Sequence, residues 1–143
     1  AAWNTVIQTV AAGFRVANCG EGGVTPHRTF RNRVAVQTHP KDRNTACTLQ
    51  TRIVDIPRNK KTSLNLRVSH HPHGDWQLRI LANGEVMEDQ IIGAETVGHD
   101  EWLNVSVDLS RFAGERVNLT LENRANNWQN EWAYWNTVEV VNE

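Results

Sequence analysis

Hydrophobic and polar residues alternate along most of the chain from about Val34 onward. In "SLNLRVSH", Leu64, Leu66 and Val68 fall on one face of an extended strand, and polar residues separate them. The run "RVAVQT" likewise places Val34 and Val36 on one face. No stretch keeps the period of an α-helix for more than two turns. The pattern therefore predicts short strands separated by turns, which is an all-β fold.

The strongest local signal is "LANGEVM", in which Asn83-Gly84 separates two alternating runs. This dipeptide is typical of a type I′ hairpin, where both central residues take positive φ. Further alternating runs are "LNVSVDL", "RVNLTLEN" and "YWNTVEVV". Together they amount to about eight or nine strands, which predicts a two-sheet antiparallel β-sandwich. The region from about Gly13 to Arg33 is rich in glycine and irregular, and we expect a long loop there.

Cysteine spacing and charge narrow the class of protein. Cys19 and Cys47 form no C-x-x-C motif, so a disulfide between them is the sharper interpretation and two buried thiols the alternative. A net charge of −1 gives no basic surface for nucleic acid, and no apolar run is long enough for membrane insertion. We expect one domain over residues 1–143, an accessory module of a larger or secreted protein located extracellularly, in the periplasm or at the cell surface. The sequence carries no signal for an oligomeric state.

Two segments carry a family resemblance: "WQLRILANGEVMEDQII" and "EWLNVSVDLSRFAGERVNLTLENRANNWQNEWAYWNTVEV". The chain from about Leu49 to Val141 resembles the galactose-binding-like jelly rolls that occur as carbohydrate-binding modules in bacterial polysaccharide-degrading proteins. The resemblance implies a jelly-roll β-sandwich with a carbohydrate ligand. Such domains often carry a structural calcium ion, but no acidic cluster assigns its ligands here, and we expect no other cofactor.

Strand direction indicates where binding residues gather. If consecutive strands are antiparallel, the loops "THPKDRNTA", "HHPHGD", "GAETVGHDE" and "NRANNWQNE" all lie at one end of the sandwich. That end collects most of the histidines together with several acidic and amide side chains, so we expect the ligand there. The expected ligand-binding residues are Trp128, Arg124, Asn126, Asn127, Glu131, His71, His73, Asp75, His39, His99 and Asp100.

The tryptophans have different expected roles. Trp128 lies in a polar loop, where an exposed ring could stack on a sugar while nearby amides bind the hydroxyl groups. Trp76 has the parity of the core, whereas Trp102 is out of phase and belongs on the outer face or in a loop. Trp132 and Trp135 have opposite parity, so one of the two should be in the core.

The histidines allow a second hypothesis. His70 continues the inward face of its strand and should be a hydrogen-bonded core residue. His71 and His73 flank a proline, an arrangement that with His39, His99 or Asp75 could bind zinc or copper in a metal-binding domain or metalloenzyme. No nucleophile elbow, zinc-protease helix or phosphate loop is present, which favours a non-enzyme. A structural or adhesion domain of a surface protein is the remaining alternative.

Overall fold

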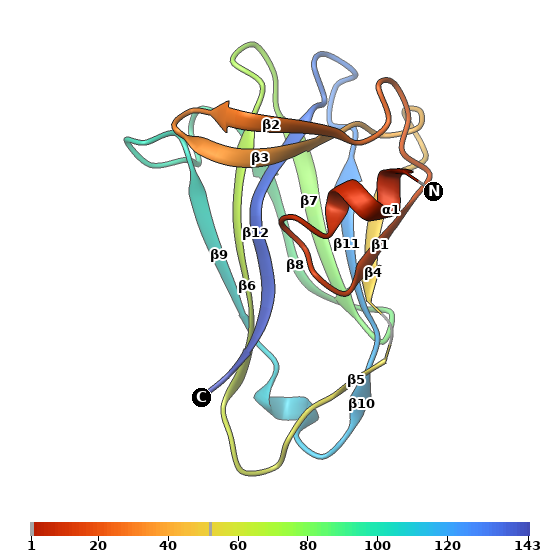
Figure 1. The fold of residues 1–143 in the computed structure, drawn as a ribbon, viewed down its shortest axis with the longest axis vertical. Helices are drawn as coiled ribbons and strands as arrows, with labels where there is room; N and C mark the ends of the chain where they lie inside the picture. The colour runs from red at the N-terminus through yellow and green to blue at the C-terminus, as the bar shows by residue number, and fades with distance from the viewer. Residues whose placement is uncertain (1, 52) are drawn as a thin grey trace.

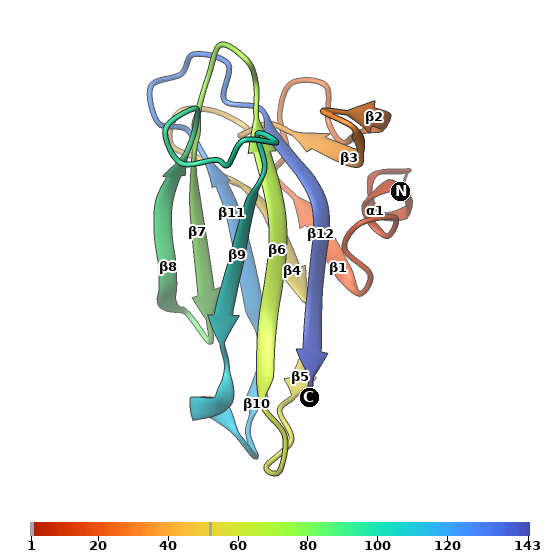
Figure 2. The same ribbon diagram turned by 90° about the vertical axis from the view of Figure 1, so that its left-hand side faces the viewer.

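The computed structural model describes residues 2–51 and 53–143, and they form two five-stranded antiparallel sheets that face each other (Figures 1 and 2). The first sheet has the order β1 (Phe14–Ala17), β4 (Cys47–Thr51), β11 (Leu119–Arg124), β7 (Trp76–Ala82) and β8 (Glu85–Ile92). The second has the order β2 (Thr25–Phe30), β3 (Arg33–Thr38), β12 (Ala133–Asn142), β6 (Thr62–His70) and β9 (Leu103–Asp108). The short strands β5 (Val54–Asp55) and β10 (Arg116–Val117), the helix α1 (Ala2–Ile7) and the 3₁₀ turn η1 (Ser110–Phe112) complete the fold. The predicted antiparallel β-sandwich is confirmed.

Most connections cross from one sheet to the other. Among consecutive strands, only β2–β3 and β7–β8 pair with each other within the described residues. The chain therefore does not follow the hairpin meander on which the end of each loop was predicted. Each crossing still reverses the direction of the chain, so loops alternate between the two ends of the sandwich (Figure 2). The predicted placement of the loops survives for this reason.

The core lies between the inner faces of the sheets. Leu64, Leu66 and Val68 are buried on β6, as their alternation predicted. Trp76 and Trp135 are both fully buried, with ring centroids 5.2 Å apart. Trp135 is thus the core tryptophan of the last strand, and a bulge after it shifts the register toward the rest of β12. The predicted hairpin is also confirmed, because Asn83 and Gly84 have φ of 49° and 79°.

One expectation for the first third of the chain is wrong. The region Gly13–Arg33 is not one long loop, because it contains β1 and β2. Val34 shares the face of Val36 but is 53 % exposed. The pairing of β3 with β12 covers only residues 36–38, so Val34 lies beyond the part of β3 that pairs with β12.

Helix α1 was not predicted, and it protects the free edge of β1. The amide oxygen of Asn4 accepts the backbone N–H of Val16 at 2.8 Å, and the amide nitrogen of Gln8 donates to the carbonyl of Phe14 at 2.7 Å. These side chains occupy backbone groups that an edge strand otherwise leaves open to another chain. No helix among the described residues is long and apolar enough to cross a membrane.

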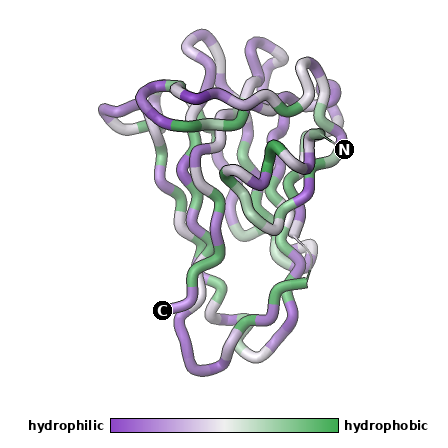
Figure 3. The backbone as a smooth tube through the Cα atoms, in the orientation of Figure 1, coloured by the Kyte–Doolittle hydropathy of each residue, from purple (hydrophilic) through white to green (hydrophobic). Residues whose placement is uncertain are grey.

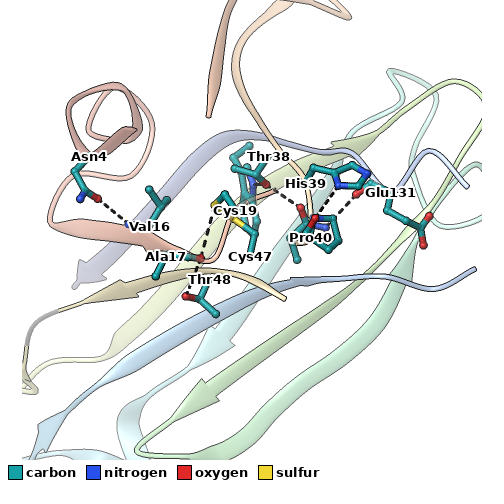
Figure 4. Close-up of a disulfide and its surroundings, with 12 residues drawn as sticks. Asn4, Val16, Ala17, Cys19, Thr38, His39, Pro40, Cys47, Thr48 and Glu131 are labelled. Atoms are coloured by element: carbon teal, nitrogen blue, oxygen red, sulfur yellow. Dashed lines mark hydrogen bonds between the residues drawn. A yellow bond between two sulfur atoms is a disulfide. The ribbon is translucent and has the colours of Figure 1, made fainter. Parts of the chain in front are cut away.

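Cys19 and Cys47 form the predicted disulfide, 28 residues apart in sequence (Figure 4). The bond joins the turn after β1 to the start of β4. It lies close to Thr38 and His39, at the end of β3, and so anchors the chain at the end of the sandwich where the ligand is expected.

Candidate functional site

Four loops gather at one end of the sandwich, at the top of Figure 1. They are the connections β3–β4, β6–β7, β8–β9 and β11–β12, which cover residues 39–46, 71–75, 93–102 and 125–132. The hydrophilic colouring of this end in Figure 3 agrees with their polar sequences. The four segments predicted to share one end therefore do so.

The β11–β12 loop is built around Glu131. Its side chain is fully buried, and its Oε1 accepts the backbone N–H groups of Asn126 and, at 2.9 Å, Asn127. Burial raises the pKa of this carboxyl above its ordinary value, although the backbone hydrogen bonds act in the opposite direction. Glu131 was expected to contact the ligand, but it lies beneath the loop and organises its backbone. The buried side chain of Glu131 thus leaves no exposed surface for a ligand in this structure.

Trp128 occupies an unusual place in that loop. Its φ is 58° and that of Asn130 is 53°, in the left-handed region that bulky side chains rarely adopt. Such a conformation costs on the order of 1 to 3 kcal/mol and persists only where surrounding contacts hold it. The hydrogen bonds to Glu131 on one side of Trp128 and those of Asn130 on the other supply such contacts.

His39 supports the indole of Trp128 from below. The ring centroids of His39 and Trp128 are 5.2 Å apart in an edge-to-face arrangement. His39 also contacts Trp132, with ring centroids 4.4 Å apart. The Nδ1 of His39 donates to the carbonyl of Pro40 at 2.8 Å, which fixes the orientation of the imidazole (Figure 4). His39 was predicted to bind the ligand, but it is only 5 % exposed, so little of its surface is open to one. Trp128 is partly buried by this contact.

The β6–β7 loop is fastened to the β11–β12 loop. The amide of Asn126 donates to Asp75 Oδ1 at 3.1 Å, and the amide of Asn130 donates to the carbonyl of His73 at 3.2 Å. A β-carbon on Gly74 would overlap the backbone of Asn130, so only glycine permits this close approach. His73, Asp75 and Asn126 are thereby held next to the loop that carries Trp128.

His70 behaves as the predicted core histidine. It is 3 % exposed, and its Nδ1 lies 2.8 Å from the carbonyl oxygens of both His71 and Gly74. A carbonyl only accepts, so Nδ1 carries the proton and Nε2 is the unprotonated nitrogen in the neutral ring. His70 thus closes the β6–β7 loop from inside.

The histidines do not assemble into the alternative metal site. The rings of His71 and His73 are 5.9 Å apart. Burial, followed by the charge of His73, lowers the pKa of His71. Over residues 2–51 and 53–143, no group of three His, Cys, Asp or Glu side chains is placed to hold a metal ion. The side chains of His39, His71, His73 and His99 are thus not gathered at one point among the described residues.

Two further expected residues have partners away from Trp128. Asp100 accepts the backbone N–H of Trp102 at 3.1 Å and pairs with Arg33 at 3.3 Å, contacts that lower the pKa of its carboxyl. Arg124 pairs with Glu122 at 3.2 Å. Asp100 thus fastens the β8–β9 loop to the β2–β3 hairpin, and Arg124 faces along its own strand. The exposed His99 lies beside Asp100 in the same loop.

Cavities border the loop end and the outer face of the second sheet. A cavity of about 580 Å³ lies between the β6–β7 and β8–β9 loops, and its walls include His73, Asp75, Glu95 and Thr96. Another of about 400 Å³ lies on the outer face of β6, β9 and β12, with polar walls that include Arg67, Asn104 and Glu139. The first shares Asp75 and His73 with the loops around Trp128. It is therefore the cavity that continues the candidate site.

Sequence reasoning considered Trp132 and Trp102 only by their strand parity. Trp102 does lie on the outer face, but the β2–β3 hairpin covers it: it is 3 % exposed, and its Nε1 donates to the carbonyl of Arg31 at 3.0 Å. Phe30 and Tyr134 stack beside it with ring centroids 3.7 Å apart. Trp132 packs against this aromatic cluster and also against His39. The position of Trp132 between the aromatic cluster and His39 depends on how the β2–β3 hairpin folds over the sheet. Strand parity alone does not predict this position.

Comparison with known proteins bears on the fold. No protein-family model matches the chain, and no curated protein matches it in sequence. The K1 cleaved adhesin domain of Lys-gingipain from Porphyromonas gingivalis W83 matches with a TM-score of 0.62 at 13 % identity, over 94 % of this chain and 93 % of that one. A family 35 carbohydrate-binding module from Clostridium thermocellum matches with a TM-score of 0.55 at 13 % identity, over 94 % of this chain and 95 % of the other.

A third structure was solved with a sugar. The module TmCBM61, in complex with β-1,4-galactotriose, matches with a TM-score of 0.53 at 16 % identity, over 95 % of this chain and 92 % of that one. At these identities the likeness concerns the arrangement of strands. The chain therefore has the β-sandwich fold that these carbohydrate-binding modules and adhesin domains share.

Proposed function

We propose that this chain is a non-catalytic carbohydrate-binding module that binds a glycan at the loop end of the sandwich. The observation that carries the proposal is the construction around Trp128. A tryptophan in a strained left-handed conformation is held by a loop that closes on the buried Glu131, and its ring rests on His39. Backbone strain of this kind concentrates at binding sites because a fixed side-chain position repays its cost there.

The groups around Trp128 suit a sugar. An indole offers an apolar face to the C–H groups of a sugar ring, while amides, imidazoles and carboxylates bind its hydroxyl groups. Asn126, Asn127, His73 and Asp75 supply such groups from two loops that are hydrogen-bonded to each other. We assign these four residues and Trp128 to the centre of the site. His71, Arg124, His99 and Asp100 lie at its periphery.

The carboxylates also favour binding over catalysis. Three of them could have formed an acid–base pair from different loops. Glu131 is buried under its loop, Asp100 pairs with Arg33, and Asp75 accepts a hydrogen bond from Asn126. Each of these three carboxylates thus already has a partner within the protein, and this favours binding over acid–base catalysis. The disulfide and the fold neighbours, which include an adhesin domain, support a location outside the cytoplasm.

A glycan array followed by titration calorimetry tests the proposal. We expect the wild type to bind at least one class of glycan and Trp128→Ala to lose about 1 to 3 kcal/mol of binding free energy, the range for removal of a central contact. Trp128→Phe keeps an aromatic face and should retain part of the affinity. A folded Trp128→Ala protein with unchanged affinity would show that another surface binds the sugar. A wild type that binds no glycan would favour a structural or adhesion role.

A further inference from the structure

A glycine-rich turn lies beside the candidate site and is firmly attached to it. The turn covers residues 20–23 and follows Cys19, whose disulfide to Cys47 anchors it (Figure 4). The backbone N–H of Gly20 donates to the carbonyl of His39 at 2.9 Å, and Gly23 closes the turn with a hydrogen bond of 2.8 Å to Gly20. The turn is therefore held next to the histidine that supports Trp128.

Two tryptophan rings lie against this turn. A β-carbon on Gly23 would lie 2.5 Å from Cε2 and Nε1 of Trp3, so the Trp3 ring is in direct contact with the glycine backbone. A β-carbon on Gly22 would lie 3.4 Å from Cη2 and Cζ3 of Trp132. Gly22 has a φ of 76° and Gly23 a φ of 63°, and positive φ disfavours any residue with a side chain at these positions. Two indoles thus flank a short stretch of bare backbone.

The contacts continue from there to Trp128. Trp132 lies 4.4 Å from His39 by ring centroids, and His39 lies 5.2 Å from Trp128. We call the series Trp3, Gly23, Gly22, Trp132, His39 and Trp128 the tryptophan strip. It runs from helix α1 to the β11–β12 loop without a break in contact.

The outer end of the strip is open. Trp3 is 41 % exposed, so a large part of its indole is open to solvent. The exposed polar side chains Glu21 and Lys41 adjoin the same turn. An apolar ring bordered by charged groups matches a sugar, which has an apolar face and a rim of hydroxyl groups.

We propose that the tryptophan strip extends the candidate site and that its ligand is a glycan chain of several units rather than a single terminal sugar. Trp128 would then stack on one sugar unit and Trp3 would stack on a more distant unit of the same chain. This inference rests on the proposed function at Trp128. It differs in assigning a ligand class, an extended oligo- or polysaccharide, and a residue far from Trp128 in sequence.

The experiment compares ligands of increasing length. Native affinity electrophoresis in gels that contain β-1,4-galactan, xylan, laminarin or pectin identifies a polysaccharide that retards the wild type. Calorimetry then measures affinity for its mono- to hexasaccharides with wild type, Trp3→Ala and Trp128→Ala, after circular dichroism has shown that each variant is folded. Trp3→Phe serves as the conservative control.

We expect wild-type affinity to rise with chain length by about tenfold or more, as a second hot-spot contact would produce. Trp3→Ala should remove most of this rise and leave the affinity for the shortest bound ligand unchanged, whereas Trp128→Ala should weaken ligands of every length. Trp3→Phe should keep part of the rise.

Three outcomes would overturn the inference. If Trp3→Ala keeps the full dependence on length while Trp128→Ala loses affinity, the strip is not part of the site and the proposed function stands. If Trp3→Ala weakens every ligand equally, Trp3 acts through the stability of the loop end. If no polysaccharide retards the wild type and the array is negative, both proposals fail together.

Discussion

The chain reverses its direction at both ends of the sandwich, but the turns at one end and the loops at the other are stabilised differently. At the end opposite the candidate site, side chains of the turns bind backbone groups of neighbouring segments. Asn83 exchanges hydrogen bonds with the backbone at Asn118 and Arg116, and Asp108 accepts the backbone N–H of Ser110 at 2.9 Å. These side chains cap short turns and connections.

The loop end also joins segments that are far apart in sequence, but here both segments are loops. Asn126 binds Asp75 across 51 residues, and Asn130 binds His73 across 57 residues. Trp128 and Asn130 have positive φ there, and a buried carboxylate holds the loop closed. The difference teaches that this end contains more structure than chain reversal requires. A surplus of this kind is what a pre-organised binding site needs.

The largest expected effect compares a tryptophan of the core with one of the loop end. Trp76→Ala should destabilise the fold by about 3 to 5 kcal/mol, because it empties a fully buried site and removes the hydrogen bond of its Nε1 to Ser69. Trp128→Ala should cost much less, since its ring is partly open to solvent. Guanidinium denaturation of both variants measures the difference. Equal losses would mean that the Trp128 loop is part of the folding core.

The next effect compares two carboxylates that accept backbone N–H groups at opposite ends. Glu131→Ala should destabilise the protein by about 2 to 3 kcal/mol, because it leaves the Asn126 and Asn127 N–H groups without their charged acceptor. Asp108→Ala removes a similar hydrogen bond at an exposed turn and should have a much smaller effect. Urea denaturation gives both values, and glycan affinity should fall only for Glu131→Ala. A matching loss in affinity for Asp108→Ala would contradict the separation of the two ends.

The sequence-based predictions were accurate where a strand buries one face, because burial imposes an alternating pattern on the sequence. Strands such as β6 bury one face, so Leu64, Leu66 and Val68 had to alternate with polar residues, and the prediction was right. β2 has no buried residue in Thr25–Phe30, so it shows no alternation and was taken for part of a loop. A strand is visible in sequence when the core demands its pattern, and β2 packs outside the core.

The gathering of the four loops at one end was predictable from the sequence, and the contacts among their residues were much less so. Reversal of direction at each strand was enough to bring four loops to one end. Which polar residue faces solvent was not: Glu131 and Asn126 look alike in a polar loop, yet one is buried and the other binds a neighbouring loop. His39 presents the same difficulty, because its burial depends on two tryptophans from the last loop. Such contacts arise from tertiary structure, and no local period records them.

The smallest expected effect is the pH dependence that Glu131 gives to the loop end. Burial raises the pKa of its carboxyl in the folded state above the ordinary value of the unfolded chain. Between these two pKa values the folded state keeps a proton that the unfolded state has lost, so stability should fall as pH rises through this window.

At the opposite end of the sandwich, stability should depend on pH with the opposite sign and at lower pH. The pKa of Asp108 is lowered by its hydrogen bonds to Ser110, so its contribution is lost as pH falls through the lowered pKa. Denaturation midpoints of wild type and Glu131→Gln, measured from about pH 4 to 7, isolate the first effect because glutamine does not titrate. As pH rises, we expect the denaturation midpoint of the wild type to fall relative to that of Glu131→Gln. A difference that stays constant with pH would mean that the hydrogen bonds from Asn126 and Asn127 cancel the effect of burial on the Glu131 pKa, and a difference that shifts toward the wild type would mean that they outweigh it.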